Sequence, residues 1–364
     1  MISFGLSEGF GISHLCSRFL IMEGECSMRT NELVSGLHTH VEYLAAAPRE
    51  PGSKHHTWSR GFIKSFLESQ LFAVREVPFT YRGHRGINLF TEPIPKDRPD
   101  LPLVIVGAHY DTARHDVSAR VAKEGTSGAD DNASGVVGME FLAKRTMELV
   151  PEHGDWCTNR VQFVAYDLEE NQLGELGCIG SRWHVEELLK GRTDVSAAII
   201  LEMIGYADAT PGSQKVFPQL KALFPDRYPD DMAGDFIGIV GNERSRSLVE
   251  TVAGSFPQVT NLPVQSLVVP GNGDMIPDVR RSDHQAFWDW EEIAKELGIC
   301  GSSVPDALMV TDTSEFRNPH YHAPTDRPET LDYVFMAAVV TGLQRALVHL
   351  LFGSGVRAEY RQPL

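Results

Sequence analysis

Two adjacent carboxylates, Asp130 and Asp131, lie in the middle of a stretch of small residues, GADDNASG, at residues 128–135. Neighbouring acids repel one another, so a folded protein accommodates such a pair readily only in water or beside a cation. An apolar helical pattern follows directly, from Val136 to Leu142, and would give the pair a rigid mount. By itself the stretch is most often a solvated turn that caps a helix. Its chemistry therefore depends on the residues that it meets in the fold.

Acids and imidazoles also follow several apolar runs of the chain. Residues 103–108, 161–166 and 197–201 are continuous apolar runs, typical of buried parallel strands, and 308–311 is a later strand. In open α/β sheets, functional groups gather at the carboxyl ends of such strands. Taken singly, each polar group has an ordinary structural explanation. The candidates, in chain order, are His109 and Asp111, Glu169 and Glu170, Glu202, and His320 and His322.

This set of side chains suits a metal centre. Imidazole and carboxylate ligands without thiolate favour zinc, with cobalt or manganese as alternatives. Two metal ions need about five or six protein ligands, with one carboxylate bridging ions about 3.5–4 Å apart, and the candidates supply that number. Two cations would also screen the repulsion among so many acids. Since residues i and i+2 share one side of a strand, Asp111 could orient the imidazole of His109.

The elements that must hold these residues alternate between strand and helix. Helical spacing of apolar residues predicts helices, and period-two or continuous apolar runs predict further strands. No repeat or long low-complexity tract interrupts the pattern, so a single α/β domain is the simplest interpretation. The predicted helices are 30–47, 55–72, 136–149, 181–189, 245–256 and 334–352, and the further strands are 73–79, 87–91, 236–240 and 266–270.

Bulk properties exclude several classes of partner and place the chain in a reducing compartment. The 364 residues carry a formal net charge of -16, which argues against nucleic acid and against anionic membrane surfaces. Five scattered cysteines form no CxxC pair, so we expect neither a thiolate metal site nor a disulfide framework. We therefore expect a cytoplasmic location.

The longest apolar run, Val334 to Phe352, contains Gln344, Arg345 and His349, which favours a core helix over a membrane span. Residues 1–27 are a poor secretory signal, and we interpret them as a loosely ordered extension before a catalytic domain at 28–364. The sequence does not indicate an oligomeric state.

The motifs, in their order and spacing, resemble one known family. GAHYD, GADDNASG, YDLEE, LEMIGY, SDH and RNPHYH are similar to the motifs of the zinc-dependent aminopeptidases, the co-catalytic metallopeptidases of peptidase family M28. The resemblance spans residues 85–340. It implies a three-layer α/β sandwich with a central, mostly parallel mixed sheet flanked by helices. It also implies two Zn²⁺ ions and a peptide substrate for the domain at 28–364.

The resemblance also implies a role for each candidate. The residues alone do not decide which member of three pairs is the ligand: Asp130 or Asp131, Glu169 or Glu170, and His320 or His322. His109 would bind one zinc and His322 the other, with Asp131 bridging them. One difference concerns Glu202, which is an aspartate in several members of the family; the longer side chain puts metal preference in question more than activity. The implied remaining roles are Glu170 and Glu202 as ligands of separate ions, Glu169 as general base, and Asp111 as the carboxylate that holds His109.

The implied activity is removal of N-terminal residues from peptides by a metal-bridging water, with Glu169 as base and Tyr206 or a loop donor facing the oxyanion. One alternative is a glutaminyl-cyclase-like acyltransferase, which uses one zinc. A carboxypeptidase or dipeptidase would follow if Arg317 met a substrate carboxylate. A binding module without metals is disfavoured because every ligand position is occupied. A nucleophilic triad at 282–284 is disfavoured because triad members are rarely consecutive.

Overall fold

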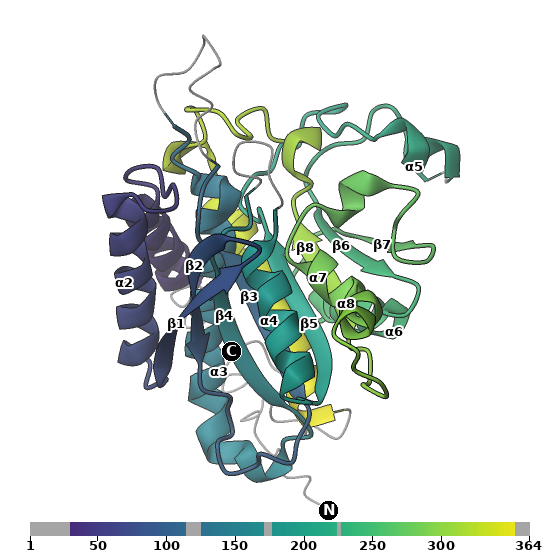
Figure 1. The fold of residues 1–364 in the computed structure, drawn as a ribbon. Coiled ribbons are helices and arrows are strands. Elements are labelled where there is room, and N and C mark those ends of the chain that lie inside the picture. The colour runs from purple at the N-terminus through teal and green to yellow at the C-terminus, as the bar shows by residue number, and fades with distance from the viewer. Residues whose placement is uncertain (1–29, 114–124, 171–176, 224–226, 354–364) are drawn as a thin grey trace, which may run out of the picture.

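The computed structural model describes residues 30–113, 125–170, 177–223 and 227–353 (Figure 1). The predicted extension at 1–27 lies outside these ranges. One eight-stranded sheet runs through the molecule in the order β1-β2-β4-β3-β5-β8-β6-β7. Its strands are β1 (Val74–Tyr81), β2 (His84–Thr91), β3 (Leu103–His109), β4 (Arg160–Tyr166), β5 (Val195–Glu202), β6 (Ile237–Asn242), β7 (Val264–Val269) and β8 (Asp306–Thr311).

The centre of the sheet is parallel and its flanks are mixed. Strands β4, β3, β5 and β8 pair in parallel, whereas β2 joins β4 and β6 joins β8 in antiparallel fashion. The register places His109 beside Tyr166, and Glu202 beside Thr311. The carboxyl ends of the central strands therefore lie level with one another at one edge of the sheet.

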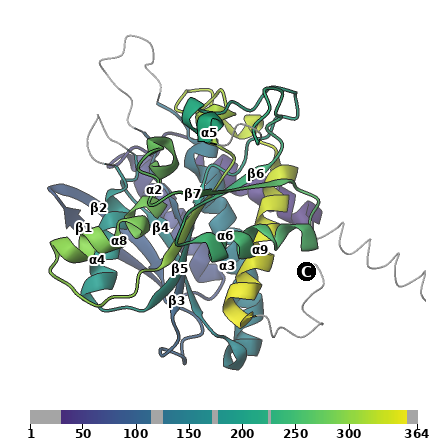
Figure 2. The same ribbon diagram turned by 90° about the vertical axis from the view of Figure 1, so that its right-hand side faces the viewer.

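Helices cover both faces of the sheet (Figure 2). On one side lie α3 (Gly135–His153), α6 (Arg246–Ala253) and α9 (Tyr333–Phe352), and on the other lie α4 (Ile179–Lys190) and α8 (Trp290–Glu296). The alternation of β3 accounts for this, because Val104 and Val106 pack in one hydrophobic core and Leu103 and Ile105 in the other. The predicted three-layer sandwich is confirmed. The layer of α3, α6 and α9 also contains helical residues 30–44 and α2 (Lys54–Ser69). The layer of α4 and α8 also contains α7 (His284–Trp288).

Helix α9 is the most apolar helix of the described chain. Its length and composition alone would allow it to cross a membrane, but 72% of its most apolar window is buried inside the protein. It packs against α3 and α6, and the carboxylate of Asp332 caps its first turn by accepting from the amides of Val334 and Phe335. The prediction of a core helix is therefore confirmed.

Short elements were the ones that sequence patterns did not indicate. Helices α5 (Pro218–Leu223), α7 and α8 have five to seven residues each, too few for apolar spacing to repeat. The hairpin between β1 and β2 turns at Arg82 and Gly83, which both have positive φ, and its strands extend beyond the predicted 73–79 and 87–91, to Tyr81 and from His84.

Candidate metal centre

The level ends of the central strands bring the predicted site residues together. His109 ends β3, Glu169 and Glu170 follow β4, and Glu202 ends β5. Asp131 lies in the turn before α3, and His322 lies in the loop after β8. All of these side chains are buried except those of Glu169, at 11% exposure, and His322, at 39%. Residues more than 200 positions apart along the chain thus share one small volume.

Two groups of three side chains are spaced closely enough to hold a metal ion each. His109, Asp131 and Glu202 form one group, and Asp131, Glu170 and His322 form the other, with the ligand atoms of each group within 4.8 Å of one another. Nε2 of His109 lies 3.3 Å from Oδ1 of Asp131, and Nε2 of His322 lies 3.1 Å from Oδ2 of the same aspartate. Asp131 therefore offers one oxygen to each group, as a bridging carboxylate requires.

The structure separates the members of each pair that the residues alone left open. Asp130 points away from the two groups, where its carboxylate accepts from the amide of Gly205 and the side chain of Asn318. His320 contacts the hydroxyl of Thr325 at 3.0 Å. Oε2 of Glu169 lies 3.9 Å from His109, beside the first group but outside both. The Glu169 carboxylate thus belongs to neither group, and its Oε1 accepts from the Cys178 thiol at 3.4 Å.

Asp111 orients both His109 and the turn that carries the two glutamates. Its Oδ1 lies 3.5 Å from Nδ1 of His109. The same carboxylate accepts hydrogen bonds from the backbone amides of Glu169, at 3.1 Å, and Glu170, at 3.3 Å. A ligand histidine held through its second ring nitrogen is a common arrangement around protein-bound metals.

Two residues that sequence patterns missed hold the Asp131 turn in place. The carboxylate of Asp326 accepts from the amides of Asp130 and Asp131, at 2.9 and 3.2 Å. The side chain of Asn132 donates to Leu201 O and accepts from the amide of Met203, so it ties the turn to both sides of Glu202. Gly128 precedes the turn with φ +61°, and a Cβ there would lie 2.2 Å from Asp131 O. The one sequence feature that could have indicated Asp326 is its position four residues after the candidate ligand His322.

The electrostatics of the centre suit a cation. Nε2 of His109 has no hydrogen-bond partner among the described residues, although the ring is buried among carboxylates. Burial opposes the charged form of His322, but Asp131 and Glu170 more than offset it and raise its pKa to about 11. Burial raises the pKa of Glu169 well above its ordinary value, and Glu202 and Glu170 add to that effect. The donor set and the unpaired Nε2 of His109 fit zinc, and binding would release protons from the imidazoles.

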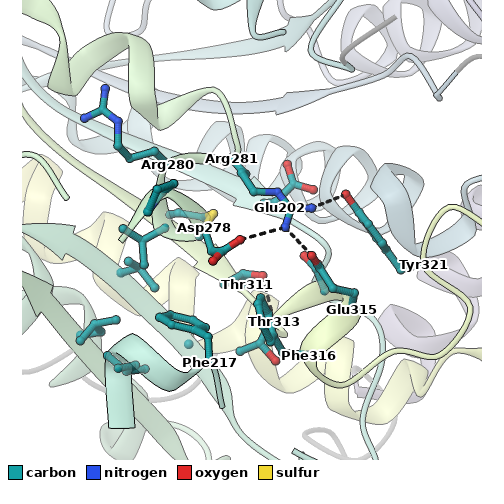
Figure 3. Close-up of a pocket in the computed structure, with 18 of the residues that line it drawn as sticks. Glu202, Phe217, Asp278, Arg280, Arg281, Thr311, Thr313, Glu315, Phe316 and Tyr321 are labelled. Carbon is teal, nitrogen blue, oxygen red and sulfur yellow. Dashed lines mark hydrogen bonds and ion pairs between the residues drawn. The ribbon is translucent and has the colours of Figure 1, made fainter. Parts of the chain in front are cut away.

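A cavity of about 650 Å³ is lined by members of both groups, Asp131, Glu170, Glu202 and His322. Figure 3 shows the part of its wall around Glu202 and Arg281. Arg281 lies at its wall and donates to Asp278, Glu315 and the hydroxyl of Tyr321, the last at 2.8 Å. The ring of Tyr321 stacks on His322 with a centroid distance of 3.9 Å. Much of the remaining wall is apolar and includes Phe217, Leu220, Met232, Phe236, Val240 and Phe316.

Four other residues considered from the sequence have structural partners instead of lining the cavity. Arg317 is 5% exposed, its guanidinium lies over the ring of Phe236, and its Nε donates to Gln214. This burial disfavours recognition of a substrate carboxylate by Arg317. The ring of Tyr206 lies against His320. Ser282 donates to Oε2 of Glu202 at 2.6 Å, while Nε2 of His284 lies 2.8 Å from Val279 O, so 282–284 form no nucleophilic triad.

A mixed α/β sandwich with paired carboxylate and imidazole groups at its strand ends places the chain among proteins whose strand ends can hold metal ions. A family model described as Peptidase family M28 matches residues 93–345, and the chain belongs to this family of metallopeptidases. It is also 38% identical over 256 residues to the "Uncharacterized protein YfbL" of Escherichia coli strain K12, a match that covers 70% of this chain and 68% of that protein.

Solved structures with the same fold include enzymes of two kinds. The Legionella pneumophila LapA aminopeptidase has a TM-score of 0.61 at 18% identity, over 95% of this chain and 77% of its own. A leucine aminopeptidase precursor from Bacteroides thetaiotaomicron has a TM-score of 0.57 at 14% identity, over 88% and 97%. Porphyromonas gingivalis glutaminyl cyclase has a TM-score of 0.56 at 18% identity, over 86% and 97%. At these identities the similarity establishes the fold, and the reaction must be argued from the site.

Proposed function

We propose that the protein is a two-zinc aminopeptidase that releases N-terminal residues from peptides. The observation that carries this proposal is the sharing of Asp131 between two complete ligand groups, with the unshared carboxylate of Glu169 beside them. A cyclase of this fold that uses one zinc would need only one of the two groups. The burial of Arg317 supports an aminopeptidase over a carboxypeptidase.

In this proposal each protein group has one task around the substrate. Zinc ions held by His109, Glu202, Glu170, His322 and the bridging Asp131 would acidify a water molecule and polarise the scissile carbonyl. Glu169 takes the proton of the attacking water and delivers it to the leaving amine. Its raised proton affinity suits this two-way transfer at neutral pH. The carboxylate of Asp111 holds the His109 ring and the backbone amide of Glu169 in fixed positions relative to each other.

Tyr321 is the protein donor best placed for the developing oxyanion. Its hydroxyl oxygen accepts from Arg281, which leaves its own proton free to donate into the cavity. Burial raises the pKa of Tyr321, and the charges of Asp131 and Glu170 raise it further, so the phenol stays protonated at neutral pH. Its stacking on His322 sets the ring beside the second ligand group.

Tyr321→Phe is therefore expected to lower kcat by about 10- to 100-fold, because one oxyanion donor is lost. KM and zinc content should change little. Steady-state kinetics and metal analysis measure this. Tyr333→Phe is the matched control, since the Tyr333 hydroxyl donates to Pro328 O, away from the cavity. Equal kinetics for Tyr321→Phe and the wild type would remove Tyr321 from the proposed mechanism.

The apolar wall predicts the preferred N-terminal residue. We expect kcat/KM for leucyl, methionyl and phenylalanyl anilides to exceed that for aspartyl anilide by at least about 10-fold, because burial of an apolar side chain in the cavity is favourable and burial of a charge is not. Anilides with a blocked amine should not be cleaved. A peptide with N-terminal glutamine separates the alternatives, since release of free glutamine supports the aminopeptidase and a cyclised product would support the glutaminyl cyclase.

A further inference from the structure

Arg49 is a buried arginine that lies outside the residues matched by the family model. It is 0% exposed and connects helical residues 30–44 to α2. A guanidinium without access to water must satisfy its donors inside the protein. Its N–H groups donate hydrogen bonds of 2.8–3.1 Å to the backbone carbonyl oxygens of Leu44, Tyr110, Ser127 and Gly128.

These acceptors belong to the two segments that carry His109 and Asp131. Tyr110 directly follows His109 at the end of β3, and Gly128 precedes Asp131 by three residues. The backbone of Arg49 adds to this contact, since its amide donates to the Thr112 hydroxyl at 2.9 Å and its carbonyl accepts from the Thr112 amide at 3.3 Å. Residues 49, 110–112 and 127–128 therefore form one hydrogen-bonded unit, which we call the Arg49 clamp.

The charge of Arg49 faces several of the acids around the centre. Burial lowers its pKa to about 10, while Asp326, Asp131, Asp111 and Glu170 favour its charged form, so it remains a cation at neutral pH. A cation near two cation sites should weaken metal binding by repulsion. The clamp should instead strengthen binding, because it holds two ligand-bearing segments at their working separation before the metal arrives. The two effects have opposite signs, and a measured affinity can distinguish them.

We propose that Arg49 is a positioning residue of the metal centre, which sets the separation of His109 from Asp131 and raises the affinity for zinc through the hydrogen bonds of its planar guanidinium. The inference rests on the zinc centre proposed above. Arg49 lies in the loop between helical residues 30–44 and α2, before the family model begins at residue 93.

The test is zinc affinity, measured by competition with a chromophoric chelator on the metal-free full chain, and it needs no activity. Arg49→Lys keeps the charge but cannot reproduce the fork of donors, and Arg49→Met removes both. Each variant is expected to bind zinc about 10- to 100-fold more weakly than the wild type. Thr112→Val removes the hydroxyl from the same clamp and should weaken binding in the same direction by less.

Leu37→Ala is the matched control for a general loss of stability. Leu37 is a fully buried core residue of the same N-terminal helix, so its truncation should lower the melting temperature and leave zinc affinity unchanged. If Arg49→Lys bound zinc as the wild type does and Arg49→Met bound it more tightly, Arg49 would be a counter-charge only and the inference would be overturned. A wild-type chain that bound no zinc would instead overturn the metal centre itself.

Discussion

Glu169→Gln is expected to lower kcat by about 10²- to 10⁴-fold while both zinc ions stay bound, because the amide can neither accept the proton of the attacking water nor return it. Glutamine has the shape of glutamate, and the backbone amide of residue 169 would still donate to Asp111. The side chain lies outside both ligand groups, so the substitution removes no zinc ligand. Steady-state kinetics on a leucyl anilide and metal analysis of the same sample measure both quantities.

The neighbouring glutamate supplies the control for this experiment. Glu170→Gln alters a member of the second ligand group and should reduce zinc content together with activity. Loss of activity with retained zinc at position 169, and loss of both at position 170, would assign the two roles. Normal turnover by Glu169→Gln would show that another group is the base.

Asp131→Asn is expected to remove zinc from both groups and to lower kcat/KM by at least about three orders of magnitude. One carboxylate serves the two groups through its two oxygens, and an asparagine offers one neutral oxygen. Metal ions supply several kcal/mol of transition-state stabilisation, and each 1.36 kcal/mol corresponds to about tenfold in rate. Metal analysis after dialysis and anilide kinetics with added zinc test the expectation.

Asp130→Asn is the matched variant, since it makes the same chemical change one residue earlier. The Asp130 carboxylate accepts from Gly205 and Asn318, so its replacement should lower thermal stability yet leave two zinc ions per chain. If instead Asp130→Asn lost zinc and Asp131→Asn retained it, the two acids would have been assigned in the wrong order.

The buried strands and the strand-end chemistry were readable from local sequence. The runs at 103–108, 161–166 and 197–201 all became central strands, because strands covered on both faces must be apolar throughout. The carboxyl ends of parallel strands meet at one edge, which is why strand patterns place His109, the pair Glu169 and Glu170, and Glu202 at the same edge of the sheet. The short helices α5, α7 and α8 lacked such a signal.

Residues that hold the site in place were much harder to find from sequence. Arg49 and Asp326 act through hydrogen bonds to backbone atoms far away in the chain, and such contacts leave no periodic or spacing pattern. Arg317 is a related case, since its place in a motif-rich loop left a substrate contact open, whereas packing buries it over Phe236.

The sequence by itself determined the class of the protein, since composition, strand patterns and motif order all depend on residues that are close together along the chain. Tertiary structure alone decided that Asp131, and not Asp130, faces the two ligand groups. A change of one position reverses the direction of a side chain, and that direction depends on distant partners such as Asn318 for Asp130 and on His109 and His322 for Asp131.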